Sequence, residues 1–215
     1  MIDWSKTDAL IFDMDGTLWD AVDSYAEIWN RCFASFGVDM TVTRAQVLDC
    51  MGLPNDKIYE KLAGPDLPVA PEVFMPVLEK REEELMPVLG GKPYPGVKDG
   101  IEQLSKKYVI LLLSNCGKTG LVNMMRHVGI TDFVTDAVTF GETHRYKDEN
   151  MVMLKEKYGL KQPVYVGDTN GDCISTHKAG LPFVHVTYGF GDCQNADISF
   201  SSFADLTDFF LKIKL

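Results

Sequence analysis

The stretch Ala9-Leu10-Ile11-Phe12-Asp13-Met14-Asp15-Gly16-Thr17-Leu18 joins a short apolar run to two carboxylates and a glycine. The run predicts a buried strand over residues 9–12. Asp13 and Asp15 follow it directly, and alternate side chains of an extended chain point to the same side. Gly16 permits a tight turn and a close approach of the backbone to an anion. The stretch therefore predicts a strand that ends in two carboxylates sharing one site.

Four further apolar, β-rich runs follow later in the chain, over residues 108–113, 137–140, 164–166 and 183–186. Segments with helical spacing separate them, over 118–128, over 149–158 and after Asp172, and a last helix is expected over 202–211. Continuous apolar strands that alternate with helices are typical of a parallel sheet covered on both faces. We therefore expect an α/β fold, with a doubly wound, Rossmann-like parallel sheet as its core.

Between the first two runs the pattern changes to helical spacing. One helix is expected over 25–36, a second beginning at the capping box of Thr43 with Gln46, a third over 54–62 and a fourth over 71–86. The acidic triplet 82–84 is interpreted as a solvated helix face. We expect a catalytic core of residues 1–18 and 94–215, and a helical cap of residues 19–93. Such an insertion lies over the crevice where doubly wound sheets bind ligands.

The composition limits which partners and which cellular compartment are expected for the protein. The 215 residues are 46% hydrophobic and 24% charged, with a formal net charge of −10. This charge argues against nucleic acid and anionic membranes as partners, and nothing indicates an obligate protein partner. The N-terminus lacks the pattern of a signal peptide, and no apolar run is long enough to span a membrane. Five scattered cysteines are typical of reduced thiols, which favours the cytoplasm: Cys32, Cys50, Cys116, Cys173 and Cys193.

Three later places complete a constellation with the carboxylate pair. Ser114-Asn115 ends the second run, Lys147 lies in the loop expected after the third, and Gly167-Asp168 begins the stretch to Asp172 after the fourth. Each place falls at the carboxyl end of an expected strand. Because those ends meet at one edge of a parallel sheet, the side chains are expected to converge on one crevice.

The set Asp13-x-Asp15-Gly-Thr, Ser114, Lys147 and Gly167-Asp168-x-x-x-Asp172 resembles the haloacid dehalogenase superfamily. The helical insertion after the first motif is similar to the C1-capped branch, which includes phosphoglycolate phosphatase and β-phosphoglucomutase. The resemblance covers nearly the whole chain. The sequence departs from it after Lys147, where many relatives have Lys-Pro-x-Pro and this chain has Asp148-Glu149-Asn150.

The resemblance implies an Mg²⁺-dependent phosphatase in which Asp13 attacks phosphorus and forms an aspartyl-phosphate. The metal ligands would be Asp13, the backbone carbonyl of Asp15, and Asp168. Asp172 would orient the metal's waters or Lys147 from outside the ligand shell. The bound Mg²⁺ would let an acidic protein accept a phosphate dianion.

The resemblance also implies the remaining roles. Lys147, the Ser114 hydroxyl and backbone N–H groups near Asn115 would bind the phosphate oxygens where charge gathers. Asp15 would protonate the leaving oxygen and then take a proton from the hydrolytic water. Displacement of halide needs no such acid, so Asp15 favours phosphate esters over dehalogenation.

The substrate is expected to be a small phosphorylated metabolite, chosen by the cap. Trp19 and Asp20 begin the hinge, and the turn of residues 52–55, ending at Asn55, could reach the substrate together with Lys57. Packing, helix capping and solvated charge are the competing interpretations of these residues.

Three other functions share parts of the pattern. A phosphomutase acting on a sugar phosphate would use the same core residues, and only the acceptor at the intermediate would differ. A receiver-type signalling domain would place its phosphoacceptor after a middle strand and would lack the cap. A non-catalytic scaffold would not need to retain every motif position.

Overall fold

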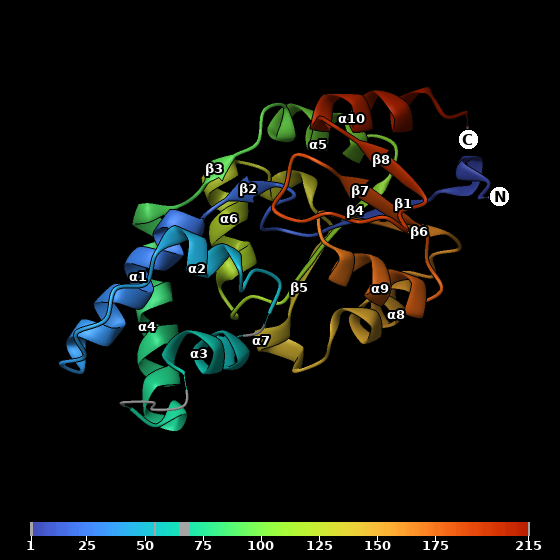
Figure 1. Cartoon of the computed structure of the whole chain (residues 1–215). Coiled ribbons are helices and arrows are strands. Elements are labelled where there is room, and N and C mark those ends of the chain that lie inside the picture. The colour runs from blue at the N-terminus through green and yellow to red at the C-terminus, as the bar shows by residue number, and fades with distance from the viewer. Residues whose placement is uncertain (1, 54, 65–68, 215) are drawn as a thin grey trace.

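The computed structural model describes residues 2–53, 55–64 and 69–214. Its centre is a six-stranded sheet in the order β5-β4-β1-β6-β7-β8, and every neighbouring pair is parallel (Figure 1). The expected α/β, Rossmann-like core is therefore confirmed. The strands are β1 (Ala9–Phe12), β4 (Val109–Ser114), β5 (Asp136–Thr139), β6 (Pro163–Gly167), β7 (Phe183–Val186) and β8 (Ile198–Phe200).

Five of these strands lie where the apolar runs predicted them, and β8 was not predicted. Its three residues are only partly buried or exposed, so it carries no continuous apolar run. Helix α5 (Val97–Ser105) was also missed, although Val97, Ile101 and Leu104 form a buried stripe at helical spacing.

Alternation along β1 divides the core between the two faces of the sheet. Leu10 and Phe12 join a cluster with helices α5, α6 (Gly120–Val128) and α10 (Phe203–Lys212). Ala9 and Ile11 face the other cluster, which holds residues of α8 (Lys147–Lys157) and α9 (Asn170–Lys178). Figure 1 shows α5 and α10 on one side of the sheet and α8 and α9 on the other. The expected helices over 118–128, 149–158 and 202–211 correspond to α6, α8 and α10.

The insertion leaves and re-enters the core through a short antiparallel ribbon. Its strands are β2 (Trp19–Asp20) and β3 (Lys92–Pro93), with Trp19 opposite Pro93. Between them lie the four helices α1 (Val22–Ser35), α2 (Arg44–Leu48), α3 (Asn55–Ala63) and α4 (Pro71–Leu89). They project to one side of the sheet (Figure 1). The capping box of Thr43 with Gln46 is present at the start of α2. Pro54, with which the third helix was expected to begin, lies outside the described residues.

An aromatic cluster packs the helices of the insertion together. Trp29, Phe33, Tyr59 and Phe74 are buried and pack ring against ring, with centroids 4.5–6.4 Å apart. Helices α1, α3 and α4 each contribute to it. Within the described ranges, none of the helices has both the length and the apolar character needed to cross a bilayer.

Candidate active site

The motif residues meet at the carboxyl edge of the sheet. Asp13 follows β1, Ser114 is the last residue of β4, and Asp168 follows β6. Lys147 is the first residue of α8, and Asp172 lies in the first turn of α9. All five are buried. The sheet order places β1 between β4 and β6, which brings the three strand ends side by side.

Lys147 forms the electrostatic centre of this group. Its Nζ lies 2.8 Å from Asp13 Oδ1 and 2.6 Å from Asp172 Oδ1, and it stands over the Tyr165 ring. Burial disfavours the charged ammonium, but the carboxylates of Asp13 and Asp172 outweigh burial and hold the pKa of Lys147 well above its usual value. Lys147 is therefore a cation at the base of the site.

The expected loop around Lys147 is wrong, because Lys147 begins α8. Asp148 and Glu149, which follow Lys147 where the pattern has Pro-x, suit the first turn of a helix. Glu149 accepts a hydrogen bond from the Tyr146 N–H at 3.3 Å, and Asp148 pairs with Lys178 at 2.6 Å. The helix N-terminus thus fixes Lys147 without a proline.

Three buried carboxylates form a cluster that could hold a metal ion. One oxygen atom from each of Asp13, Asp168 and Asp172 lies within 4.8 Å of the others. Asp168 Oδ2 accepts a hydrogen bond from the Phe190 N–H at 2.7 Å, while Oδ1 is buried and has no partner among the described residues. A buried carboxylate oxygen without a donor is costly unless a cation neutralises it, so these residues fit a divalent metal.

Asp172 and Asp168 differ in whether their carboxylate oxygens already have hydrogen-bond partners. Asp172 Oδ2 accepts hydrogen bonds from the N–H and hydroxyl of Thr169, at 3.1 and 2.7 Å, and its Oδ1 is held by Lys147. Both oxygens are already engaged. Burial, followed by the charges of Asp172 and Asp13, raises the pKa of Asp168 well above its usual value. Asp168 therefore retains a carboxylate oxygen without a partner among the described residues, whereas both oxygens of Asp172 are engaged.

Two glycines make room for Asp168. Gly16 has φ +81°, and a Cβ atom there would lie 2.1 Å from Asp168 Oδ2. A Cβ atom on Gly189 would lie 2.3 Å from Asp168 Cβ. Both positions therefore require glycine. Gly16, but not Gly189, was singled out from the sequence.

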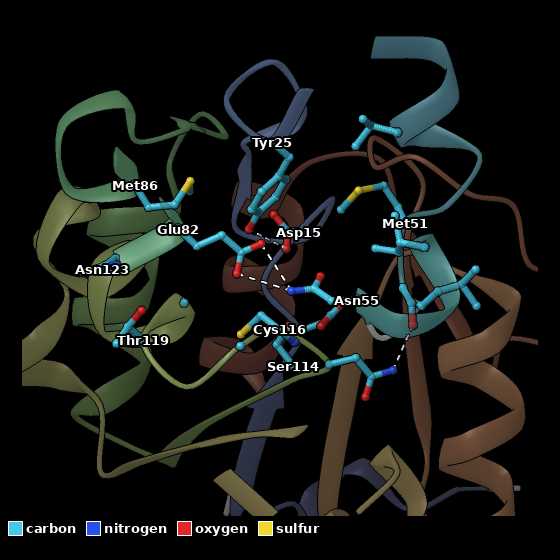
Figure 2. Close-up of a pocket in the computed structure, with 18 of the residues that line it drawn as sticks. Asp15, Tyr25, Met51, Asn55, Glu82, Met86, Ser114, Cys116, Thr119 and Asn123 are labelled. Carbon is cyan, nitrogen blue, oxygen red and sulfur yellow. Dashed lines mark hydrogen bonds between the residues drawn. The ribbon is translucent and has the colours of Figure 1, made fainter. Parts of the chain in front are cut away.

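Asp15 lies beside this group, and its orientation is fixed. Trp19 Nε1 donates to Asp15 Oδ1 at 3.0 Å, and the Tyr25 hydroxyl donates to Oδ2 at 3.3 Å (Figure 2). Burial, followed by the charge of Asp13, raises the pKa of Asp15 to about 8. Burial also raises the pKa of Asp13, to about 6, while Lys147 opposes this rise. The two carboxyl groups therefore differ in their affinity for a proton.

Ser114 and Asn115 occupy the end of β4 as expected. The Ser114 hydroxyl accepts a hydrogen bond from the Cys116 N–H at 3.3 Å. Asn115 Nδ2 donates to the Gly52 carbonyl at 2.8 Å, which joins the core to the insertion. Both side chains line the cavity described next.

A cavity of about 820 Å³, including the space at its mouth, opens above the carboxylates between the core and the insertion (Figure 2). The core contributes Asp13, Asp15, Ser114 and Lys147 to its wall. The insertion contributes mainly apolar side chains: Trp29, Val47, Met51, Leu53, Ile58 and Met86.

The four candidate specificity residues are placed differently. Asn55 lines the cavity. Trp19 is fully buried and contacts Asp15, as described above. Asp20 accepts a hydrogen bond from the Val22 N–H at 3.1 Å and pairs with Arg44, so it joins α1 to α2. Lys57 is exposed, pairs with Glu60 at 3.0 Å, and is not among the residues that line the cavity.

The cavity residues that sequence reasoning missed include Tyr25 and Glu82. The interpretation of residues 82–84 as a solvated face is wrong for Glu82, which lines the cavity and accepts a hydrogen bond from Asn55 at 3.3 Å. A signal was present in the sequence. Glu82 continues, at intervals of four, the buried stripe of Phe74, Leu78 and Met86 on α4.

Comparison with known proteins agrees with the fold. Residues 10–186 match the model of the family described as haloacid dehalogenase-like hydrolase. The chain belongs to this family, and the resemblance seen in its motifs is confirmed. It is a hydrolase built on a doubly wound sheet with an inserted helical segment.

Among curated proteins, the chain is 28% identical to a phosphoglycolate phosphatase of Rhodobacter capsulatus, over 85% of each chain. It is 26% identical to a phosphoglycolate phosphatase of Vibrio cholerae, over 90% of this chain and 91% of the other. A haloacid dehalogenase-like hydrolase from Streptococcus pneumoniae has the same fold, with a TM-score of 0.83 at 18% identity over 96% of this chain and 99% of that chain.

Proposed function

We propose that the chain is an Mg²⁺-dependent phosphatase that hydrolyses small phosphate monoesters through an aspartyl-phosphate on Asp13. One observation carries the proposal. Asp13 lies at the base of the cavity between a buried cation, Lys147, and Asp168, which retains an unpartnered carboxylate oxygen among the described residues. A nucleophilic carboxylate needs positive charge on both sides before it can approach a phosphate dianion.

Asp13 and Asp168 are the side chains that would hold Mg²⁺, together with the backbone carbonyl of Asp15. When bound, the ion supplies positive charge that offsets the repulsion between Asp13 and the phosphate. An Asp13 oxygen bonds to phosphorus as the ester P–O bond breaks. Lys147, Ser114 and the backbone near Asn115 hold the remaining phosphate oxygens.

Asp15 acts as the general acid and then as the general base. It gives its proton to the departing alkoxide, and then removes a proton from the water that attacks the phosphorus of the aspartyl-phosphate. Inorganic phosphate and free Asp13 result. The position of Asp15, held by Trp19 and Tyr25 at the cavity wall, supports this role.

The two parts of the chain have different roles. We propose that residues 1–18 and 94–215 form the catalytic core, and that residues 19–93 form a cap that encloses a small phosphorylated metabolite. The hydrogen bond between Asn115 and Gly52 supports a closed arrangement of the two. All five cysteines are free, which suits a reducing compartment, and we place the enzyme in the cytoplasm.

A phosphomutase would share the same core, but the curated relatives described above are named as phosphatases, which favours water as the acceptor. The deciding experiment measures phosphate release from an aryl phosphate with Mg²⁺ present. The wild type is expected to turn over, and Asp13→Asn is expected to lose at least a thousandfold in kcat while keeping its circular dichroism and Tm. The exposed Asp39→Asn is the control. Near-normal turnover by Asp13→Asn would rule out Asp13 as the nucleophile.

A further inference from the structure

Glu82 is a cavity carboxylate to which the proposed mechanism gives no role. It comes from α4 and faces Asp15 and Tyr25 across the cavity (Figure 2). Asn55 Nδ2 of α3 lies 3.3 Å from both of its oxygens. Burial raises the pKa of Glu82 to about 7, and the charge of Glu79 adds to this rise. An acidic group has therefore been placed where the leaving group of a substrate would lie.

Among the described residues that line the cavity, no Lys or Arg is paired with Glu82. Lys147 is the single Lys or Arg among the cavity's described lining residues, and it is held at the base by Asp13 and Asp172. In the insertion, Arg44 pairs with Asp20 and Asp23. Lys57 and Lys61 are likewise engaged, with Glu60 and the Asp49 carbonyl.

On the core side, Lys118 is not among the residues that line the cavity. Lys118 is exposed and lines a small adjoining cavity with Glu79, Glu82 and Glu83. It thus faces the acidic side of α4. The part of the cavity wall that the insertion contributes consists, among the described residues, of apolar side chains, the Tyr25 hydroxyl, the Asn55 amide and the Glu82 carboxyl group.

This wall would discriminate between substrates by the charge of their leaving groups. Above pH 7, where Glu82 is ionised, a substrate carboxylate placed against it would meet a like charge in a partly desolvated site. Apart from Lys147 at the base, no Arg or Lys among the described lining residues could pair with that carboxylate. A hydroxyl or an ammonium could instead donate a hydrogen bond to Glu82, and the Asn55 carbonyl oxygen can accept a second. The apolar side chains exclude water and leave room for a short carbon chain.

We propose that Glu82 and Asn55 form a leaving-group subsite for phosphate esters of alcohols that carry a second hydrogen-bond donor, a hydroxyl or an ammonium, and that this subsite rejects esters that carry a carboxylate. The proposal rests on the proposed function, since it names the substrate class of the same site. It separates this chain from its curated relatives, whose name specifies the carboxylate-bearing ester phosphoglycolate.

A matched series of two-carbon esters tests the subsite. The substrates are 2-hydroxyethyl phosphate, 2-aminoethyl phosphate, ethyl phosphate and phosphoglycolate, with an aryl phosphate as reporter of general activity. For the wild type, kcat/KM is expected to be at least a hundredfold higher for the better of the two donor-bearing esters than for phosphoglycolate. Comparison of 2-hydroxyethyl phosphate with 2-aminoethyl phosphate shows whether the subsite prefers a hydroxyl or an ammonium donor.

Variants assign the discrimination to Glu82. Glu82→Gln keeps a hydrogen-bond acceptor for Asn55. In this variant, the ratio of kcat/KM for the donor-bearing ester to kcat/KM for phosphoglycolate is expected to fall at least tenfold. Glu84→Gln removes the same charge from an exposed position on α4 and is expected to keep the wild-type ratio.

The outcomes are separable. Failure to hydrolyse the aryl phosphate would contradict the proposed function itself. Turnover of the aryl phosphate, with phosphoglycolate processed as well as the donor-bearing esters, would overturn the subsite and leave the function standing. The wild-type ratios decide this point even if Glu82→Gln does not fold. A soluble Glu82→Gln with unchanged ratios would also overturn the assignment.

Discussion

Lys147 and Asp172 form an ion pair 2.6 Å long, in which 6% and 2% of the respective side chains are exposed. The pair links α8 to α9 and holds the ammonium at the Asp13 carboxylate. Because Asp172 also closes the capping box of α9 with Thr169, helix capping and placement of the active-site cation depend on the same carboxylate.

Replacement of Lys147 by methionine is therefore expected to destabilise the protein. It leaves Asp13 and Asp172 buried without their counter-charge, and breaking a buried pair costs about 3–5 kcal/mol. Urea unfolding with EDTA present measures the change. Lys178→Met, which breaks a pair with Asp148 in which the lysine side chain is 71% exposed, is the control and is expected to cost less than about 1 kcal/mol. Equal effects of the two variants would contradict the structural importance of Lys147.

Divalent metal is expected to stabilise the folded protein through Asp168. Binding to the folded state alone adds about 2.7 kcal/mol when the metal is at a hundred times its Kd. Thermal unfolding with MgCl₂ against EDTA should show a rise in Tm for the wild type and little or none for Asp168→Asn. The exposed Asp192→Asn is expected to respond like the wild type. An undiminished rise in Asp168→Asn would place the metal elsewhere.

The base of the site could be predicted from the sequence because strand ends determine it. Asp13, Ser114 and Asp168 each follow an apolar run, and a parallel sheet gathers such ends at one edge whatever the details of its packing. Lys147 was assigned to the correct place along the chain but to a loop, because the acidic residues after it were compared with prolines and not with a helix start.

The cavity wall could not be predicted in the same way. Which residues of α1 and α4 face the substrate depends on how the helices of the insertion sit over the core, and local spacing does not determine that. Lys57, chosen for its charge, is exposed, and Glu82, dismissed for its charge, lines the cavity. A polar residue within a buried helical stripe was the more informative signal.

The hydroxyl of Tyr25 is expected to hold the Asp15 carboxyl in the orientation in which Asp15 donates its proton. Tyr25→Phe removes the hydrogen bond to Asp15 Oδ2 and frees the carboxyl to rotate. General acid catalysis contributes about 10²–10⁴-fold in total, so loss of positioning should lower kcat by about tenfold for an alkyl phosphate. An aryl phosphate, whose leaving group needs little protonation, should be affected much less. The exposed Tyr146→Phe is the control, and equal losses on both esters would argue against a role through Asp15.

The raised pKa of Glu82 is expected to make stability depend on pH. Its surroundings comprise Asn55, Tyr25, Cys116, Lys118, Glu79 and Glu83. The pKa of this carboxyl is 4.5 in its ordinary setting and about 7 in the folded protein, where burial is the main cause. The folded state therefore binds the proton more tightly, and the stability that this gives below pH 4.5 is lost as the pH rises through 7.

Glu82→Gln removes this titration and keeps the hydrogen-bond acceptor. Its free energy of unfolding, relative to that of the wild type, should rise between pH 5 and pH 8 by about 1–3 kcal/mol, the lower figures reflecting the partial exposure of the residue. Urea unfolding at the two pH values measures the difference, with Glu84→Gln as the control. A relative stability that stays constant, or that falls as the pH rises, would show that the Glu82 carboxyl is solvated in the folded protein, and would also remove the desolvated like charge on which rejection of carboxylate esters depends.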